Sequence, residues 1–414
     1  MEILVEQNGD YTNIDAQFDA LMAQGFKTAM MLYAEGGFVQ DPNYKNVIDT
    51  RLKNRFENGL QIFGGIFPGI MDNGELMSRG SIIAGIQSKV HIAALEQLDP
   101  QSMRQDLETQ LAPVKPALEN GEFNTLFVFG DGFGENNHHL IDGLNELVAA
   151  YPMNVIGGLT GRDQVKAAHF TIFTPEKMIQ NGAVLAFTRL ESGIGVRHGW
   201  EPLLESELEV TAINGCFIEA FNNKPALDVY LDLICSYDQE IQQIRDSVVR
   251  DVDLFFDRVA IRYPLGLIRK AKNRKTYIDR TAVSLGGDNS LQFSTEIPVG
   301  TEVSILHLKG ESKTDQCNQL TNAAISAYRE SQRKFPEGTL GKRVIMMDCV
   351  GRNKLVTDLG RNFEEVEFKN ISQVQRNTDH SPIGPLTFGE ISSTGDGGVE
   401  LHNKTAVVAT IEDH

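Results

Sequence analysis

Residues 125–158 of the 414-residue sequence read TLFVFGDGFGENNHHLIDGLNELVAAYPMNVIGG. This stretch joins an apolar run, Thr125–Gly130, to a glycine-containing loop, a helical pattern over His139–Ala150 and a second apolar run, Asn154–Gly158. Short apolar runs on either side of a helix are typical of two parallel strands joined by a crossover helix. A turn-rich stretch then leads to another apolar run, Gly182–Thr188, which we interpret as an added hairpin strand.

The same plan occurs earlier in the chain. The apolar run Thr28–Tyr33 (TAMMLY) is followed by a helical stretch at Asn46–Asn58, the run Leu60–Gly65 (LQIFGG) and the run Gly80–Ile86 (GSIIAGI). A repeated unit of this kind indicates the architecture before any single motif does.

A looser third copy lies near the C-terminus. It consists of Arg343–Asp348 (RVIMMD), a helical stretch, and strands expected at Ile383–Ile391 and His402–Ile411. The sequence therefore predicts an α/β fold of repeated strand–helix–strand units, covered by helices and extended by antiparallel hairpin strands. It leaves open whether the copies share one sheet or form separate sheets.

Composition narrows the classes of function. The formal net charge of −18 disfavours nucleic-acid phosphates and anionic lipid as partners. No apolar run approaches the roughly 20 residues of a membrane helix, and the N-terminus lacks the pattern of a secretory signal. The four cysteines form no C-x-x-C pair and fit reduced thiols. We therefore expect a cytoplasmic protein with neither nucleic-acid nor membrane partners.

Several polar residues and glycines lie where ligands bind open α/β sheets, at the ends of predicted strands. Gly157 and Gly158 end one strand, and glycine there permits either a structural turn or close approach of a ligand. Cys349 and Arg352 follow another strand, and an arginine can pair with a ligand carboxylate or a haem propionate.

Three more candidates lie in the C-terminal segment. Glu390 can pair with a ligand amine or fix a loop, while His402 and Asn403 can bind ligand or tie the preceding turn to the backbone. We predict a ligand-binding set of Gly157, Gly158, Cys349, Arg352, Glu390, His402 and Asn403.

None of the nine histidines falls in a zinc-protease spacing. A b-type haem needs only one axial histidine, and the candidates are His198, within HGWEP, and His307, in an apolar run. No paired-carboxylate or nucleophile–base pattern supports catalysis, so we expect no enzymatic activity and assign no catalytic residue.

Four stretches together resemble the FIST sensory family, in the family's order along nearly the whole chain. They are IGGLTGRD (156–163), GAVLAFTRLESGIGVRHGWEP (182–202), MMDCVGRNKL (346–355) and GPLTFGEISSTGDGGVELHNKT (384–405). The resemblance implies a FIST N-type domain at 1–224 and a FIST C-type domain at 225–414, with a ligand cleft between or within the halves.

For function, the resemblance implies a bacterial signal-transduction sensor of small molecules such as amino acids. The chain also resembles one branch of this family, whose members bind haem, sense nitric oxide and act on a separate histidine kinase. Because we find no fused output segment, we expect the chain to report to such a partner; a homo-oligomer is compatible with the sequence. The alternative of another class is a thiol-dependent enzyme that uses Cys349, Arg352, Glu390 and His402.

Overall fold

The computed structural model of the protein describes residues 1–37, 41–134, 136–163, 169–204, 207–271, 274–310, 312–335, 343–374, 382–393 and 398–412. The chain forms two compact units. The first unit contains Met1–Arg197, Thr321–Val356 and Gly360–His414, and the second contains His198–Leu320 with Thr357–Leu359. The second unit is thus an insertion in the chain of the first, and each is described by itself.

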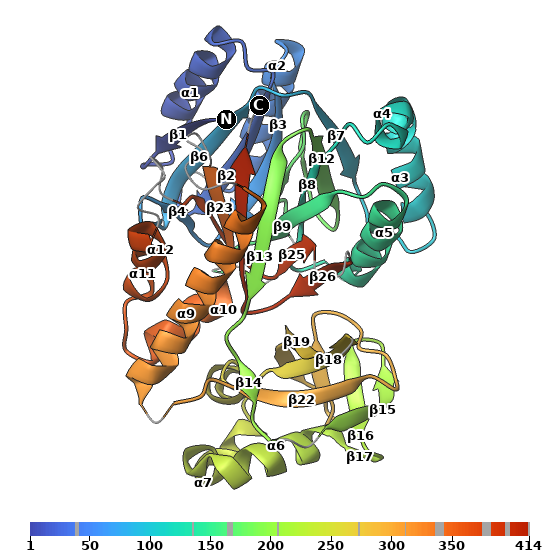
Figure 1. Ribbon diagram of the computed structural model, residues 1–414, viewed down its shortest axis with the longest axis vertical. Coiled ribbons are helices and arrows are strands. Elements are labelled where there is room, and N and C mark those ends of the chain that lie inside the picture. Colours follow the sequence, from blue (N-terminus) through green and yellow to red (C-terminus); the bar gives the residue numbers. More distant parts are fainter. Residues whose placement is uncertain are drawn as a thin grey trace. The chain divides into compact units, whose positions relative to one another are not determined.

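Three mixed sheets form the framework of the first unit in the described part of the chain (Figure 1). The first sheet has the order β1 (Glu2–Glu6), β6 (Arg79–Ile86), β2 (Thr28–Glu35), β3 (Gln61–Phe67), β10 (Ile172–Phe173), β11 (Met178–Ile179). The second has the order β7 (Val90–Leu95), β12 (Ala183–Thr188), β8 (Thr125–Asp131), β9 (Asn154–Thr160), β25 (Glu390–Ser393), β26 (Val399–His402). The third has the order β13 (Glu191–Arg197), β27 (Ala406–Glu412), β23 (Arg343–Cys349), β24 (Gly384–Thr387), β4 (Ile70–Asp72), β5 (Glu75–Met77).

Each sheet contains one parallel pair: β2–β3, β8–β9 and β23–β24, which define the first, second and third repeats. The last two strands of each sheet come from a different repeat. The hairpin β4–β5 pairs with β24, β10–β11 with β3, and β25–β26 with β9. The exchange is cyclic, so the repeats form three separate sheets in a pseudo-threefold arrangement, which answers the question that the sequence leaves open.

A glycine occupies the same register position in the second parallel strand of every repeat. An ideal Cβ would lie 2.0 Å from the Met31 carbonyl oxygen at Gly64, and 1.8 Å from the Val128 carbonyl oxygen at Gly157. At Gly384 the corresponding distance, to the Met346 carbonyl oxygen, is 1.8 Å. Real Cβ atoms are excluded at such distances, so these glycines are required by backbone approach.

The inner faces of the three sheets share one apolar core. Phe63 of the first sheet lies 6.2 Å from Phe127 and 6.3 Å from Phe129 of the second, measured between ring centroids. Ile345 and Met347 supply side chains from the third sheet. Strands buried in this core and covered by helices outside read as continuous apolar runs, which explains why periodicity located them.

Helices cover the outer faces of the sheets. On the first sheet lie α1 (Tyr11–Ala23) and α2 (Tyr44–Glu57). On the second lie α3 (Met103–Leu111), α4 (Lys115–Glu119) and α5 (Asn137–Ala150), with a short 3-10 turn, η2 (Ala112–Val114), between the first two. The third repeat carries α9 (Lys313–Ser331), η4 (Gln332–Lys334), α10 (Val350–Asp358), α11 (Phe363–Val366) and α12 (Phe368–Val374). None of the described helices combines the length and apolar content that crossing a membrane requires.

The second unit packs helices against a largely antiparallel sheet around its own core. Its strands are β14 (Glu201–Pro202), β15 (Leu208–Asn214), β16 (Phe217–Phe221), β17 (Lys224–Pro225), β18 (Leu265–Ala271), β19 (Arg274–Arg280), β20 (Ala282–Leu285), β21 (Leu291–Phe293) and β22 (Glu302–His307). Its helices are α6 (Ala226–Tyr237), α7 (Gln239–Val248), α8 (Val252–Phe255) and the π-helical turn η3 (Phe256–Ala260).

The predicted α/β class of repeated strand–helix–strand units with added hairpin strands is confirmed, but two of its strands are wrong. The single strand expected at Ile383–Ile391 is two strands, β24 and β25, which belong to different sheets. The strand expected at His402–Ile411 begins only at Ala406, because Lys404 has a φ of 50° and turns the chain. The bounds of the predicted domains, 1–224 and 225–414, differ from the bounds of the compact units, and these domains stay a prediction.

Replacing Gly64 with alanine should reduce the free energy of unfolding by about 2 kcal/mol or more, because overpacking is costly and the residue has a φ of +137°. Urea unfolding measures the loss. Gly143→Ala, within helix α5, is the control. The one described atom within 4 Å of its Cβ would be the terminal methyl carbon of Met103, at 3.0 Å. Equal stability of the two variants would contradict the role assigned to Gly64.

Candidate functional site

Six of the seven predicted ligand-binding residues lie together in the first unit, on adjoining strands, the turn that follows β26 and helix α10. Gly158 in β9 stands opposite Glu390 in β25, which in turn stands opposite His402 in β26. The chain continues from His402 through Asn403 to a tight turn. Arg352 joins this group because its guanidinium donates to the Lys404 carbonyl oxygen at 3.0 Å. The sixth residue, Gly157, precedes Gly158.

Arg352 lies between two buried carboxylates. Its Nε is 3.2 Å from Asp348 Oδ1, and its Nη2 donates to Glu367 Oε1 at 2.6 Å. All three side chains are fully buried. Within the described residues, Asp348 Oδ2 and Glu367 Oε2 accept no hydrogen bond. Unpaired buried carboxylate oxygens are costly, so this part of the cluster retains unused capacity to bind a donor.

Glu390 is held by the strands around it. Its Oε1 accepts from the Thr387 hydroxyl at 2.7 Å, and its Oε2 accepts from the Thr405 amide at 3.1 Å. The Thr387 hydroxyl also lies 3.2 Å from the Asp348 carbonyl oxygen. These contacts close a ring that runs from Asp348 through Arg352 and the 404–405 turn to Glu390 and back. We call the carboxylates and cation of this ring the buried cluster: Asp348, Arg352, Glu367 and Glu390.

The seventh predicted residue, Cys349, ends β23 beside the cluster. Its backbone amide donates to Asp348 Oδ1 at 2.9 Å, and its side chain is 4% exposed. A substrate would have to displace protein to reach this thiol. Gly158 allows close packing, because an ideal Cβ there would lie 2.5 Å from the Thr387 methyl group.

Burial and mutual charge shift the pKa values of Asp348, Glu367 and Arg352. Burial raises the pKa of Asp348 well above its ordinary value, and the Glu367 carboxylate raises it further against the opposing effect of Arg352. Burial also raises the pKa of Glu367, again opposed by Arg352. Burial by itself lowers the pKa of Arg352, but the two carboxylates outweigh it and leave that pKa raised. Both buried carboxyls beside the one guanidinium thus have raised pKa values, so we expect the pair to hold one shared proton.

The first two repeats provide an internal comparison for Glu390. The residues at its register position are Ile172, opposite Gly65, and Ile70, opposite Pro385. Both isoleucines are fully buried. In two of the three repeats, a buried apolar side chain therefore fills this position.

The same contrast holds next to Glu390 and at the end of the first strand. His402 pairs with Glu390 where the other hairpins carry Ile179 and Met77. In the first parallel strand of each repeat, one residue lies opposite Gly64, Gly157 or Gly384. The residue two positions after it is Tyr33 in the first repeat, Gly130 in the second and Asp348 in the third. Since burying carboxylates costs free energy, the polar set of the third repeat is not a requirement of the architecture.

The two histidines predicted as haem ligands lie in the second unit. His198 accepts the Trp200 amide on Nδ1 at 3.0 Å. His307 ends β22, and its ring lies edge-on to Tyr237 with centroids 5.0 Å apart. Burial lowers the pKa of His307, which favours the neutral imidazole that iron requires. The described residues contain no group of three or more side chains suited to a metal ion.

Sequence reasoning missed Asp348, Glu367 and Thr387. Asp348 and Thr387 stood inside the motifs MMDC and GPLT, where a charged or hydroxyl residue at the end of an apolar run was the available signal. Glu367 belongs to a carboxylate-rich run that reads as a solvated surface, and only the packing of the segment after α11 buries it. No local pattern distinguishes it from Glu364 and Glu365.

Asp348→Asn should make the free energy of unfolding less dependent on pH. A carboxyl whose pKa is raised by folding stabilises fully below its ordinary pKa of 3.8, and that contribution is lost as the pH rises through the raised value. The natural protein should therefore lose stability relative to the variant as the pH rises from about 4. Urea unfolding over a pH series measures this. Glu57→Gln, an exposed carboxylate of α2, is the control, and parallel curves for all three proteins would contradict the shared proton.

Comparison with known families covers most of the residues of the site. The FIST N domain matches residues 33–224, and the FIST C domain matches residues 226–393. A search of curated proteins finds no match. The two matches contain the expected motifs as far as Ser393, and the His402–Asn403 segment lies beyond them. The chain belongs to the FIST family, with its N and C domains in succession.

Proposed function

We propose that the protein is a cytoplasmic, bacterial small-ligand sensor that reports to a separate signalling partner such as a histidine kinase, and that it is not an enzyme. FIST domains are sensor domains of signal transduction that bind small ligands. The observation that carries the proposal for this chain is the buried cluster, which has polar residues where the other repeats are apolar. The domains of this sensor are 1–224, FIST N-type, and 225–414, FIST C-type.

The contacts of Arg352 modify the role expected for it. Its guanidinium already contacts Asp348, Glu367 and the Lys404 carbonyl oxygen. We therefore assign Arg352 to positioning the two carboxyls, and the ligand contact to the carboxyls themselves. Because both carboxyls are fully buried, a ligand reaches them only when the segments that cover them move. A ligand with an ammonium group, such as an amino acid, supplies the donors that Asp348 Oδ2 and Glu367 Oε2 lack among the described residues.

Ligand binding at this position would act as a switch by exchanging a proton for a ligand cation. The ammonium group would displace the shared proton and hold both carboxyls ionised. Because Arg352 and Glu390 connect the cluster to the 404–405 turn and to β25, the new charge state favours one arrangement of these segments. A partner that binds this arrangement better would detect the shift in population.

Amino acids should raise the melting temperature of the protein, whereas N-acetylated amino acids should not. At 100 times the dissociation constant a ligand adds about 2.7 kcal/mol of stability, which corresponds to several degrees. A thermal-shift screen with twenty amino acids, their N-acetyl derivatives and the corresponding amines measures this. Glu390→Gln should weaken the response about tenfold, because it removes a charge from the cluster while preserving its shape.

Glu57→Gln, far from the cluster in sequence and exposed on α2, should respond like the natural protein. Equal stabilisation by free and N-acetylated amino acids, or an unchanged response of Glu390→Gln, would contradict binding of the ammonium group.

The second candidate is a haem-based nitric oxide sensor of the same family. The buried ring of His307, whose pKa is lowered by burial, favours it, and His198 is the alternative axial ligand. Trp200 is the only tryptophan of the sequence and donates its amide to His198, so it is a built-in reporter of this neighbourhood.

Protein from haem-supplemented cells should, on this second candidate, show a Soret band that moves on addition of nitric oxide. His307→Ala or His198→Ala should abolish the band, and haem titration should quench Trp200 fluorescence in the natural protein. The absence of a Soret band at stoichiometric haem would reject haem and leave the amino-acid sensor as the single candidate.

A further inference from the structure

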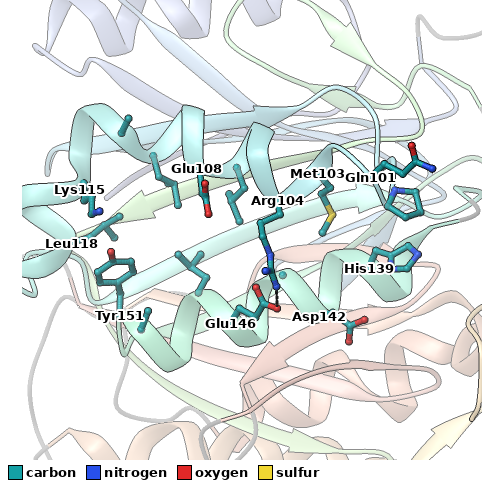
Figure 2. A pocket seen from close by; sticks show the side chains of 17 residues that line it. Gln101, Met103, Arg104, Glu108, Lys115, Leu118, His139, Asp142, Glu146 and Tyr151 are labelled. Atoms are coloured by element: carbon teal, nitrogen blue, oxygen red, sulfur yellow. Dashed lines mark hydrogen bonds and ion pairs between the residues drawn. The ribbon is translucent and has the colours of Figure 1, made fainter.

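Away from the buried cluster, helices α3 and α5 border an open groove of about 880 Å³. Figure 2 shows its two walls, with Gln101 and His139 near one end and Leu118 and Tyr151 near the other. A second cavity of about 290 Å³ continues past Leu118 and Tyr151 towards Met153. The floor of the groove is apolar and is supplied by Met103, Leu107, Leu111, Leu118 and Leu147.

The first repeat shows how the corresponding helices close this space. Arg55 of α2 pairs with Asp15 and Asp19 of α1, and its guanidinium lies 5.7 Å from the Phe18 ring centroid. Arg51 adds a further ion pair with Asp15. Between α3 and α5, the described residues form one ion pair across the groove, Arg104–Glu146 (Figure 2).

The Arg104–Glu146 pair is a weak closure. Both of its side chains are more than half exposed, and exposed ion pairs contribute about 0–1 kcal/mol. A guest can therefore separate these side chains at small cost. The groove remains accessible along its length.

A glycine in the wall of the groove supports a role in binding. Gly143 lies inside α5, where glycine costs about 1 kcal/mol relative to alanine. An ideal Cβ at Gly143 would have one neighbour within 4 Å among the described residues, the flexible end of Met103 at 3.0 Å. Only this flexible side-chain end would have to shift for an added methyl group, and the glycine leaves its part of the wall without a side chain.

The rim of the groove is mainly acidic. Glu108 and Asp142 of the groove, and Glu119 of the adjoining second cavity, are exposed and form no ion pair within the described residues. Arg104 pairs with Glu146, which leaves Lys115 as the other cation among the lining residues. An elongated, open groove between two helices, with an apolar floor and an acidic rim, matches an amphipathic helix whose apolar stripe is flanked by basic residues.

We propose that the α3–α5 groove is the docking site for a basic amphipathic helix of the signalling partner. The inference deepens the proposed function by naming a surface and a partner chemistry. Apolar side chains at positions i, i+3 or i+4 and i+7 of the guest enter the groove, and its lysines or arginines meet the carboxylates of the rim.

The test uses three fluorescein-labelled helical peptides and the full chain, with fluorescence anisotropy as the readout. The first peptide carries a leucine stripe flanked by lysines, the second replaces the lysines with glutamates, and the third replaces the leucines with serines. The first should bind at least about tenfold more tightly than the other two. Raising the salt concentration should weaken this binding.

Gly143→Leu should fill the groove and weaken binding of the lysine-flanked peptide about tenfold or more. Ala149→Leu is the matched control, because it adds the same side chain to the same helix at an exposed position that does not line the cavity. Circular dichroism and melting temperature establish that both variants are folded.

Equal binding of the three peptides, or an unchanged affinity of Gly143→Leu, would overturn the proposal. So would binding of the apolar dye ANS without binding of the lysine-flanked peptide, which would assign the groove to a small molecule. Failure here is distinguishable from failure of the sensor proposal, because the amino-acid response is measured separately and depends on Glu390 rather than Gly143.

Discussion

The cyclic exchange of hairpins is the constraint on which the first unit depends. Each parallel pair gains its outer strands from another repeat, so no sheet is complete until all three repeats are present. Within each parallel pair the two backbones lie very close together, and Gly64, Gly157 and Gly384 are the positions where a side chain would prevent this approach. The three inner faces can then bury one common core.

This arrangement also explains why the buried cluster assembles from distant parts of the chain. Asp348 and Arg352 follow the first strand of the third repeat, whereas Glu390 lies on the hairpin that completes the second sheet beside Gly158. The exchange of the hairpin therefore joins the two sheets at the site. In the other repeats the same junction is apolar, with Ile172 and Ile70, so the geometry is a property of the fold and the charge is a property of one repeat.

The pseudo-symmetry separates structural from functional features elsewhere too. The helix pair α1–α2 is closed by arginine–carboxylate pairs, and the pair α3–α5 is open apart from Arg104–Glu146. Equivalent positions in one molecule share the same scaffold, so a difference between them cannot be attributed to the architecture. Both proposed sites, the buried cluster and the groove, are such differences within the first unit.

The sequence by itself determined the repeated strands and helices, because strands buried on both faces give short continuous apolar runs such as TLFVFG and TAMMLY. It also singled out Gly158, Arg352, Glu390 and His402 because glycines and polar residues at or just after the ends of such runs are conspicuous, and the structure brings these four residues together; their binding of a ligand stays a prediction. It failed at Ile383–Ile391 and His402–Ile411, where apolar runs cross a turn between sheets.

Only the tertiary structure decided the exchange of hairpins, the burial of Glu367 and the opening of the α3–α5 groove. Strand partners, burial and cavities are set by contacts between residues far apart in sequence, and apolar periodicity reports only that a face is covered, not which element covers it. Glu367 illustrates the limit: its neighbours Glu364 and Glu365 have the same chemistry, and only packing against Arg352 separates it from them.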